Sequence, residues 1–371
     1  MRSRTRAIQR SSFCLGIALL LLSAVGTTRG DEEPAKLRAY AKSVDLAVDK
    51  ALLFLARNQA ANPTHDGSFA DWNGQTNAVA GLAGMAFLAK GYRPGVAPYG
   101  DVINATIDYI LATPTESGYL GGRGGKMYGH GIATLYLSEV SGMVDPARQE
   151  KIDRVLARAL KVILDAQKVP REKPEENGGW RYEPDSKDSD ISVTGWCLMA
   201  LRSARLNGAA VPEQAIHDAV GFIDRCRRGD DNGFRYNPTA DWWYARRGYW
   251  VRNPSTPART AAALLCRELT GHHADEVNRL AADYLIKATQ PGTLLNNEGH
   301  HAYGTYYAAQ GMFQIGGEHW EQFGEVMYQY LLAKQQSNGS WYLENKGEVY
   351  PTAMYTLALT VSYRQLPIYQ R

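Results

Sequence analysis

Apolar residues along this chain recur every three to four positions, as in helices, and no stretch alternates apolar and polar residues as a half-buried strand does. The spacing predicts twelve helices that follow one another as six pairs. Their expected bounds are Val44–Gln59 with Asn77–Gly91, Val102–Ala112 with Gly131–Met143, Pro146–Gln167 with Ile191–Leu206, Glu213–Arg228 with Ala258–Gly271, Glu276–Thr289 with Thr305–Ile315, and His319–Gln335 with Thr352–Leu366.

The two helices of each pair differ in their polarity. First helices are amphipathic, as in residues 152–156, whereas second helices are apolar and small nearly all round, as in residues 78–85. A helix without a polar face belongs in the interior, so the pattern predicts six outer helices around six inner ones. An open solenoid would need a polar cap at each end, and neither terminal pair has one. We therefore expect an all-α, closed (α/α)6 toroid of six helical hairpins, formed as a single domain by residues 31–371.

The loops that join a first helix to a second helix share a glutamine or asparagine, a glycine and an aromatic residue. Glycine permits the left-handed turn that ends a helix, and a glutamine can bond the carbonyls exposed there. We interpret these loops as clasps between neighbouring hairpins, with the aromatic residue packed over the turn. The four clasps recognised are Gln59 to Phe69, Gln167 to Trp180, Asn232 to Phe234, and Gln335 to Trp341.

Residues Gln335–Trp341 match a Q-x3-G-x-W element, and the other clasps are looser versions of it in register with the helix pairs. In this respect the chain resembles the prenyltransferase and squalene-oxidase repeat family over essentially its whole length. The resemblance implies the toroid of terpenoid cyclases such as squalene–hopene cyclases, of protein prenyltransferase β subunits and of complement thioester domains. Because these proteins do unrelated work, the fold alone does not settle the function.

None of the three activities of these relatives is fully supported by this sequence. Residues 188–196 resemble the D-x-D-D-T-A motif of the cyclases, but alignment on Trp196 puts Ser189 at the position of the proton-donating aspartate. Asp224 and Cys226 have the Asp-x-Cys spacing of the prenyltransferase zinc site, but protein prenylation is a cytosolic activity, which the leader-like residues 1–30 contradict. The glycine-rich residues 121–125 lack the thioester cysteine. The sequence thus predicts a repeat protein without an intact family active site, and neither a cofactor nor a metal.

The first thirty residues have the composition of a leader. Four arginines precede an apolar stretch at residues 13–24, and small residues at cleavage spacing follow it. We predict a signal peptide over residues 1–30 and export to the periplasm or the extracellular space; an uncleaved N-terminal anchor is the alternative. No second apolar stretch approaches the length of a bilayer, so we expect no membrane span after leader cleavage.

Charge and cysteine content narrow the function further. The 371 residues carry a formal charge of +3, but the leader holds five arginines and no acid, which leaves 36 basic and 38 acidic residues, or −2, in the rest. A near-neutral body gives no electrostatic footprint for nucleic acid. The three cysteines outside the leader lie in apolar helical stretches, where core packing is expected rather than a disulfide framework.

In such a toroid every loop from an outer to an inner helix opens at the same end, around the mouth of a central cavity. As catalytic candidates these loops supply Asp188, Asp190 and His130. Each aspartate can act either as a helix cap or as a general acid or base in a walled pocket. The candidate ligand-binding residues are His65, Asp66, Trp243, Arg247, Trp250, His300, His301, Tyr303 and Tyr307.

Three functions remain compatible with this set. The cavity binds an apolar, isoprenoid-like molecule; or the protein binds a glycan or a protein partner without turnover; or it degrades a polysaccharide through His130, Asp190, Arg247 and Tyr303. The failure of each family active site favours the second. A deep apolar pocket would favour the first, a cleft with paired carboxylates the third, and a plugged centre the second.

Overall fold

The computed structural model describes residues 33–70, 76–122, 125–239, 242–244, 249–251, 253–273, 275–295 and 300–369, and it forms one compact unit from Glu33 onward. The predicted leader therefore lies outside the described residues, as do the side chains of residues 242–244 and 249–251. Within the described part, no helix is long and apolar enough to cross a membrane.

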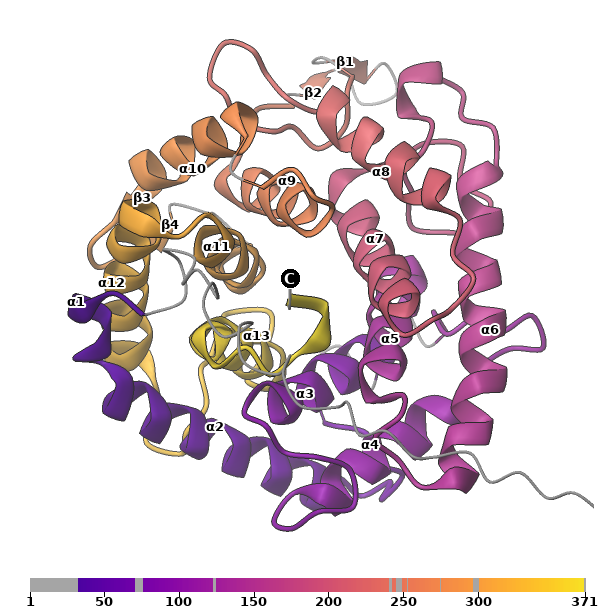
Figure 1. Ribbon diagram of the computed structural model, residues 1–371, viewed down its shortest axis with the longest axis vertical. Helices are drawn as coiled ribbons and strands as arrows, with labels where there is room; N and C mark the ends of the chain where they lie inside the picture. Colours follow the sequence, from indigo (N-terminus) through magenta and orange to yellow (C-terminus); the bar gives the residue numbers. More distant parts are fainter. Residues whose placement is uncertain are drawn as a thin grey trace, which may run out of the picture. The chain divides into compact units, whose positions relative to one another are not determined.

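Figure 1 shows an inner set of helices side by side around a centre and an outer set arranged around them. The first inner helix packs against the last, so the ring is closed. The outer helices are α2 (Ala41–Ala61), α4 (Gly100–Leu111), α6 (Pro146–Lys168), α8 (Glu213–Arg225), α10 (Glu276–Ala288) and α12 (Gly317–Lys334). The inner helices are α3 (Asn77–Ala89), α5 (Lys126–Val140), α7 (Ile191–Leu206), α9 (Pro257–Leu269), α11 (His301–Ile315) and α13 (Val349–Leu359). The predicted toroid and all twelve helices are confirmed.

The burial of the helices follows their composition. Every residue of α3 from Val79 to Ala89 is buried, whereas α6 buries only the stripe that repeats every three or four positions from Ile152. Small residues let the inner helices approach closely: a Cβ on Gly84 would lie 2.5 Å from the ring of Tyr136 on α5. Glycine in these helices is a packing requirement that outweighs its poor helix propensity.

The glutamines of the clasps join neighbouring outer helices. Gln59 donates through Nε2 to the carbonyl of Gly67 in its own loop (2.9 Å) and to the Thr106 hydroxyl on the next outer helix (2.9 Å). Gln167 bonds Gly178 and Ala215 of α8 in the same way, at 2.8 Å each. Gln335 donates to the Gly339 carbonyl (2.9 Å) and to the carbonyl of Ala47 on α2 (2.8 Å), so the same bond ties the last outer helix to the first.

The clasp glycines and aromatics complete this joint. Gly339 has φ +93°, and a Cβ there would lie 2.4 Å from the Lys50 carbonyl oxygen of the next outer helix. The buried Trp341 donates its indole N–H to the Leu331 carbonyl (2.8 Å) and its backbone N–H to the hydroxyl of Thr352 on the inner helix (2.9 Å). One loop thus fixes its own outer helix, the next outer helix and the following inner helix.

Some predicted boundaries were wrong. Helix α5 begins at Lys126 rather than Gly131 and α11 at His301 rather than Thr305, because these inner helices extend to the clasp. Helix α13 ends at Leu359 instead of Leu366, where the chain turns through Arg364 in a left-handed conformation. Four short helices and four short strands were not predicted: α1 (Ala35–Arg38), η1 (Pro174–Glu176), η2 (Val361–Tyr363), η3 (Pro367–Tyr369), β1 (Trp242–Tyr244), β2 (Tyr249–Val251), β3 (Thr289–Gln290) and β4 (Leu294–Leu295).

The centre of the ring is filled. Trp196 on α7 stacks on Tyr306 of α11, with ring centroids 5.4 Å apart and planes at 9°, and Tyr307 packs against both. From the carboxyl ends of the inner helices the C-terminal segment enters the same centre, as Figure 1 shows, where Tyr369 bonds the Tyr306 hydroxyl. These aromatic rings and the C-terminal segment together form a plug. The ring is therefore open at its other end, where the amino ends of the inner helices lie.

A buried carboxyl group contacts the C-terminal segment of the plug. Glu139 on α5 accepts hydrogen bonds from the Ser203 hydroxyl (2.5 Å) and from the backbone N–H of Ile368 (3.3 Å). Burial raises the pKa of Glu139 to about 7, although these bonds and the charge of Arg202 oppose the rise.

The three cysteines, Cys197, Cys226 and Cys266, are also buried, and each is a free thiol in the core, as expected.

We expect Gly339→Ala to lower the free energy of unfolding by about 2 kcal/mol more than Gly271→Ala. Both glycines have φ +93°, but nothing lies within 4 Å of a Cβ on Gly271. The control therefore contains the backbone strain alone, about 1 kcal/mol, and the difference measures the close approach to Lys50. Urea denaturation of both variants provides the comparison, and equal losses would contradict the clasp as a close-packed joint.

Glu139→Gln is expected to change how stability depends on pH. Because the folded-state pKa is about 7 against an ordinary 4.5, the folded wild type binds the proton more tightly, and this group's contribution falls as pH rises from about 4.5 to 7. The glutamine variant lacks that loss, so its stability relative to wild type should increase by roughly 3 kcal/mol between pH 4.5 and 7.5. Urea midpoints across this range measure it; parallel curves would show that Glu139 does not titrate differently on folding.

Candidate functional site

A cavity of about 710 Å³ opens at the amino ends of inner helices α5, α7, α9, α11 and α13. Tyrosines and basic side chains dominate its lining, and no Asp or Glu is among the described residues that line it. The aromatic and basic groups are Tyr128, Tyr182, Tyr236, Tyr303, Tyr350, Arg259, His300, His301 and Lys346, and the rest are Ser192, Ser255, Thr256, Pro257, Ala258, Ala302 and Leu343. The cavity lies where the sequence analysis expected it.

Eight of these residues occupy one of two recurring positions in the repeat. Five lining residues precede by two positions a fully buried threonine or histidine of the same inner helix: Tyr128 before His130, Ser192 before Thr194, Ala258 before Thr260, Tyr303 before Thr305 and Tyr350 before Thr352. Three others follow a clasp aromatic by two positions: Tyr182 after Trp180, Tyr236 after Phe234 and Leu343 after Trp341. Each joint therefore presents side chains to the same opening.

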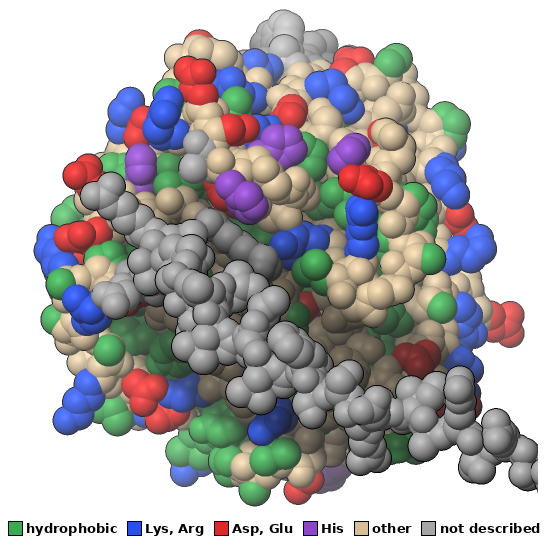
Figure 2. Space-filling view, in the orientation of Figure 1, with side chains coloured by type: hydrophobic (Ala, Val, Ile, Leu, Met, Phe, Trp, Pro, Cys, Tyr) green, Lys and Arg blue, Asp and Glu red, His purple; other side chains and the backbone are tan. Residues whose placement is uncertain are grey.

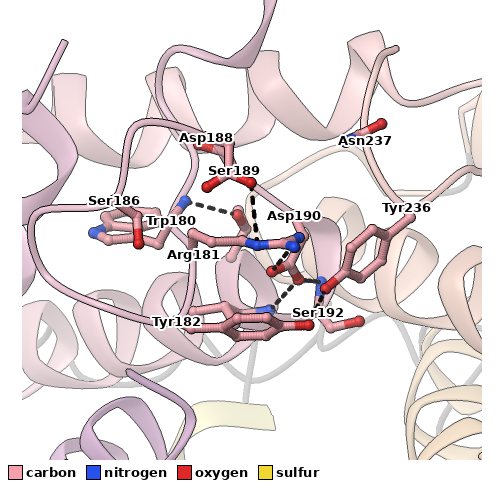
Figure 3. Close-up of polar contacts among 12 residues, drawn as sticks. Trp180, Arg181, Tyr182, Ser186, Asp188, Ser189, Asp190, Ser192, Tyr236 and Asn237 are labelled. Carbon is pink, nitrogen blue, oxygen red and sulfur yellow. Dashed lines mark hydrogen bonds and ion pairs between the residues drawn. The ribbon is translucent and has the colours of Figure 1, made fainter. Parts of the chain in front are cut away.

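One wall of the cavity rests on a buried ion pair. Figure 3 shows Arg181 between Asp188 and Asp190, with Tyr182 and Tyr236 beside it. The Arg181 guanidinium lies 3.3 Å from Asp188 and 3.4 Å from Asp190, and 4.3 Å from the Tyr182 ring centroid. Asp188 is 48% exposed and lines a separate depression of about 220 Å³, so it is not brought to the cavity. Asp190 is fully buried beneath the tyrosines.

Asp190 caps helix α7. One carboxylate oxygen accepts the backbone N–H groups of Ser192 and Val193, both at 2.9 Å. Burial raises the pKa of Asp190 to about 6, against the opposing effects of Arg181, the two amides and the nearby Tyr236 hydroxyl. The Tyr236 hydroxyl bonds that of Tyr182 at 2.6 Å, and both rings line the cavity. Two phenols therefore lie between the buried acid and the opening.

Ser189, which takes the position of the cyclase proton donor, is fully buried and accepts a hydrogen bond from Arg171 (2.9 Å). It belongs to the frame of the loop and does not line the cavity.

His130 has both ring nitrogens engaged. Its Nδ1 accepts the backbone N–H of Leu120 (3.0 Å), so the proton is on Nε2, which donates to the Ala159 carbonyl (3.0 Å). Burial lowers the pKa of His130 to about 4. In the clasps of Trp180 and Trp341 an inner-helix threonine accepts the tryptophan N–H, and the indole donates to the preceding outer helix. Here one histidine accepts the loop N–H and donates to the next outer helix, α6. It lies behind the lining residues.

The adjacent His300 and His301 both line the cavity, but they are held differently. His301 donates from Nε2 to the Thr293 carbonyl (3.1 Å) and accepts from the Tyr355 hydroxyl at Nδ1 (2.8 Å). His300 lies at the mouth of the cavity, immediately before α11. Partial burial there, then the charges of Lys346 and Arg259, lower the pKa of His300, so three basic groups from three segments of the chain lie near one another.

The remaining candidates divide into three groups. Tyr303 lines the cavity, and Tyr307, one turn deeper, belongs to the aromatic plug. His65 and Asp66 are exposed in the first loop, where Asp66 accepts the Ser68 N–H (3.0 Å), and they do not line the cavity. Trp243 and Trp250 pair across β1 and β2, but their side chains and Arg247 lie outside the described residues.

Sequence reasoning missed Tyr128, Tyr182, Tyr236, Arg259 and Lys346. The register two positions after each clasp aromatic would have indicated Tyr182 and Tyr236, and the inner-helix register Tyr128. Arg259 follows the N-cap residue Thr256 by three positions. Nothing in the sequence indicated that Arg259 would line the cavity, since an arginine in a helix usually faces solvent.

The arrangement limits the possible chemistry. Paired carboxylates for glycoside hydrolysis are absent from the described lining, and no three potential metal ligands gather in the part of the chain that the structure describes. A cavity rich in hydroxyls and cations is a poor environment for an isoprenoid chain. On the face shown in Figure 2, acidic and basic side chains are interspersed wherever the surface is visible.

No family model and no curated protein sequence matches this chain. Among solved structures, an inactive variant of an α-1,6-mannanase from a Salegentibacter species, in complex with α-1,6-mannotriose, covers 86% of this chain and 99% of its own, with 9% identity and a TM-score of 0.62. A family 76 glycoside hydrolase from a bovine Bacteroides thetaiotaomicron strain covers 87% of this chain and 78% of its own (10% identity, TM-score 0.61).

A type II terpene cyclase from Scytonema is similar over 88% of this chain and 99% of its own, with 16% identity and a TM-score of 0.57. At these identities the likeness concerns the fold. The chain has the α/α toroid shared by family 76 mannanases and type II terpene cyclases, and this fold agrees with its resemblance to the squalene cyclase-like repeat proteins.

Proposed function

We propose that this protein is a binding toroid whose loop-end cavity holds a glycan, without the paired-carboxylate machinery of a hydrolase. The observation that carries the proposal is a cavity above a plugged centre, lined by five tyrosines and four basic residues and by no described carboxylate. Tyrosine rings stack on sugar faces while their hydroxyls exchange hydrogen bonds with sugar hydroxyls. The leader-like residues 1–30 support an exported protein, for which a glycan is an accessible ligand.

The volume also suits this ligand. About 710 Å³ lies within the usual range of small-molecule sites, roughly 300–1,000 Å³, and admits a short oligosaccharide. An isoprenoid would need a deep apolar chamber, whereas Trp196, Tyr306 and Tyr307 fill that space.

A second candidate is a polysaccharide-acting enzyme. Its support is the position of Asp190 beside the hydrogen-bonded pair Tyr236 and Tyr182, because an acid with a pKa near 6 suits proton exchange with the cavity at neutral pH. The mannanase fold is compatible with this alternative as an analogy only.

Tyr303→Phe is expected to weaken oligosaccharide binding three- to tenfold, because the Tyr303 hydroxyl is buried at the cavity with no hydrogen-bond partner of normal geometry among the described residues. The full chain is screened against an oligosaccharide array, and the best ligand is measured by calorimetry. Tyr92→Phe, which removes a hydroxyl between α3 and α4 at the opposite end, should bind like wild type. An array without any bound oligosaccharide would refute the proposal.

Asp190→Asn separates binding from turnover. Asparagine caps helices as well as aspartate, so the variant should fold, and we expect oligosaccharide affinity within about threefold of wild type and no product from either protein. Asp145→Asn, at the cap of α6 beside Arg148, is the matched control. Products are sought by mass spectrometry. Cleavage by wild type and Asp145→Asn, but not by Asp190→Asn, would establish the second candidate instead.

A further inference from the structure

We propose that the loop-end cavity selects an acidic saccharide, and that Arg259 binds the sugar carboxylate. This inference rests on the proposed glycan-binding function and specifies its ligand class. It starts from an imbalance of charge: Arg259 and Lys346 line the opening together with His300, and no acidic residue does so among those described. The buried Asp190 is already paired with Arg181 and capped against α7.

The Arg259 guanidinium is held in place but not neutralised. One Nη1 hydrogen bond goes to the Pro254 carbonyl (2.8 Å), and the group lies over the Tyr236 ring, 5.1 Å from its centroid. No described carboxylate forms an ion pair with it. Its remaining N–H groups have no described partner, and a planar guanidinium fork matches the two oxygens of a carboxylate. The contact with the Tyr236 ring helps to hold the guanidinium at the opening.

The surroundings favour negative charge at the same point. His300 is exposed to the charges of both Arg259 and Lys346, so the free cavity holds basic groups that repel one another. Helices α9, α11 and α13 point their amino ends, which carry partial positive charge, at the opening, and no side chain caps α11 or α13. The unpartnered, buried Tyr303 hydroxyl supplies a further donor. A bound anion relieves this repulsion.

The rest of the lining identifies the anion as part of a sugar. Tyr128, Tyr182 and Tyr350 place aromatic faces and hydroxyls around the basic group, which a hexuronate ring uses fully and an inorganic anion does not. A prenyl diphosphate offers the charge, but its chain would lie against histidines and hydroxyls. The structure therefore points to a uronate residue of an oligosaccharide.

The test compares matched ligands on the full chain. Hexuronate trisaccharides of several linkages are titrated by calorimetry beside their methyl esters, which keep the rings and remove the charge, with inorganic phosphate and geranyl diphosphate as separate arms. At least one free acid should bind ten or more times more tightly than its ester, and this preference should shrink as salt is added. By NMR, the pKa of His300 should rise when that acid binds.

Variants assign the preference to Arg259. Arg259→Gln should bind acid and ester alike, and Arg259→Lys should retain part of the preference. Arg154→Gln, which makes the same charge change on the exposed face of α6, should behave as wild type. A folded Arg259→Gln protein that still prefers the acid would overturn the role of Arg259.

Glycan binding and the preference for an acidic glycan are contradicted by different results. Equal binding of acid and ester by wild type would overturn the acidic ligand and leave glycan binding intact. Binding of phosphate or geranyl diphosphate alone would show an anion site that is not a saccharide site. If no saccharide of either kind binds, the proposed function fails with the inference.

Discussion

The contact between each clasp loop and the next outer helix is the constraint from which the rest of this structure follows. A left-handed glycine brings the loop against the backbone of the neighbouring helix, and a glutamine donates to carbonyls on both sides. No side chain fits between them without a shift of the backbone, so any residue other than glycine at this position is destabilising. Since the same joint ties α12 to α2, local geometry repeated around the chain closes the ring without a separate closing element.

The closed ring decides what its centre contains. Inner helices that approach through glycine and alanine leave little room, and Trp196, Tyr306, Tyr307 and the C-terminal segment occupy it. The open space in this chain is a cavity at one end of the ring. The residues that line this cavity lie at the amino ends of the inner helices and in the neighbouring loops.

Charge within that cavity is organised in two layers. Asp190 and Arg181 neutralise each other beneath the tyrosines, where an unpaired charge would be costly to desolvate. Above them, Arg259, His300 and Lys346 line the opening of the cavity, and the charges of Arg259 and Lys346 disfavour protonation of His300. The lower layer is an ion pair that the fold itself satisfies, and the upper layer is the one on which the proposed ligand binding rests.

The sequence by itself determined the toroid, the alternation of amphipathic outer helices with apolar inner helices, and the clasps. These features depend on the spacing of apolar residues and on glycine at fixed loop positions. It also placed His300, His301 and Tyr303 at the cavity mouth, since the end of each inner helix is known once the helices are. The sequence could not determine how deeply each side chain is buried. His130 lies behind the lining residues and Tyr307 in the central plug, whereas Arg259 and Tyr236 line the opening. Whether a polar side chain is buried or presented depends on the rotation of each helix and on neighbours far apart in the chain, and only the tertiary structure decided that.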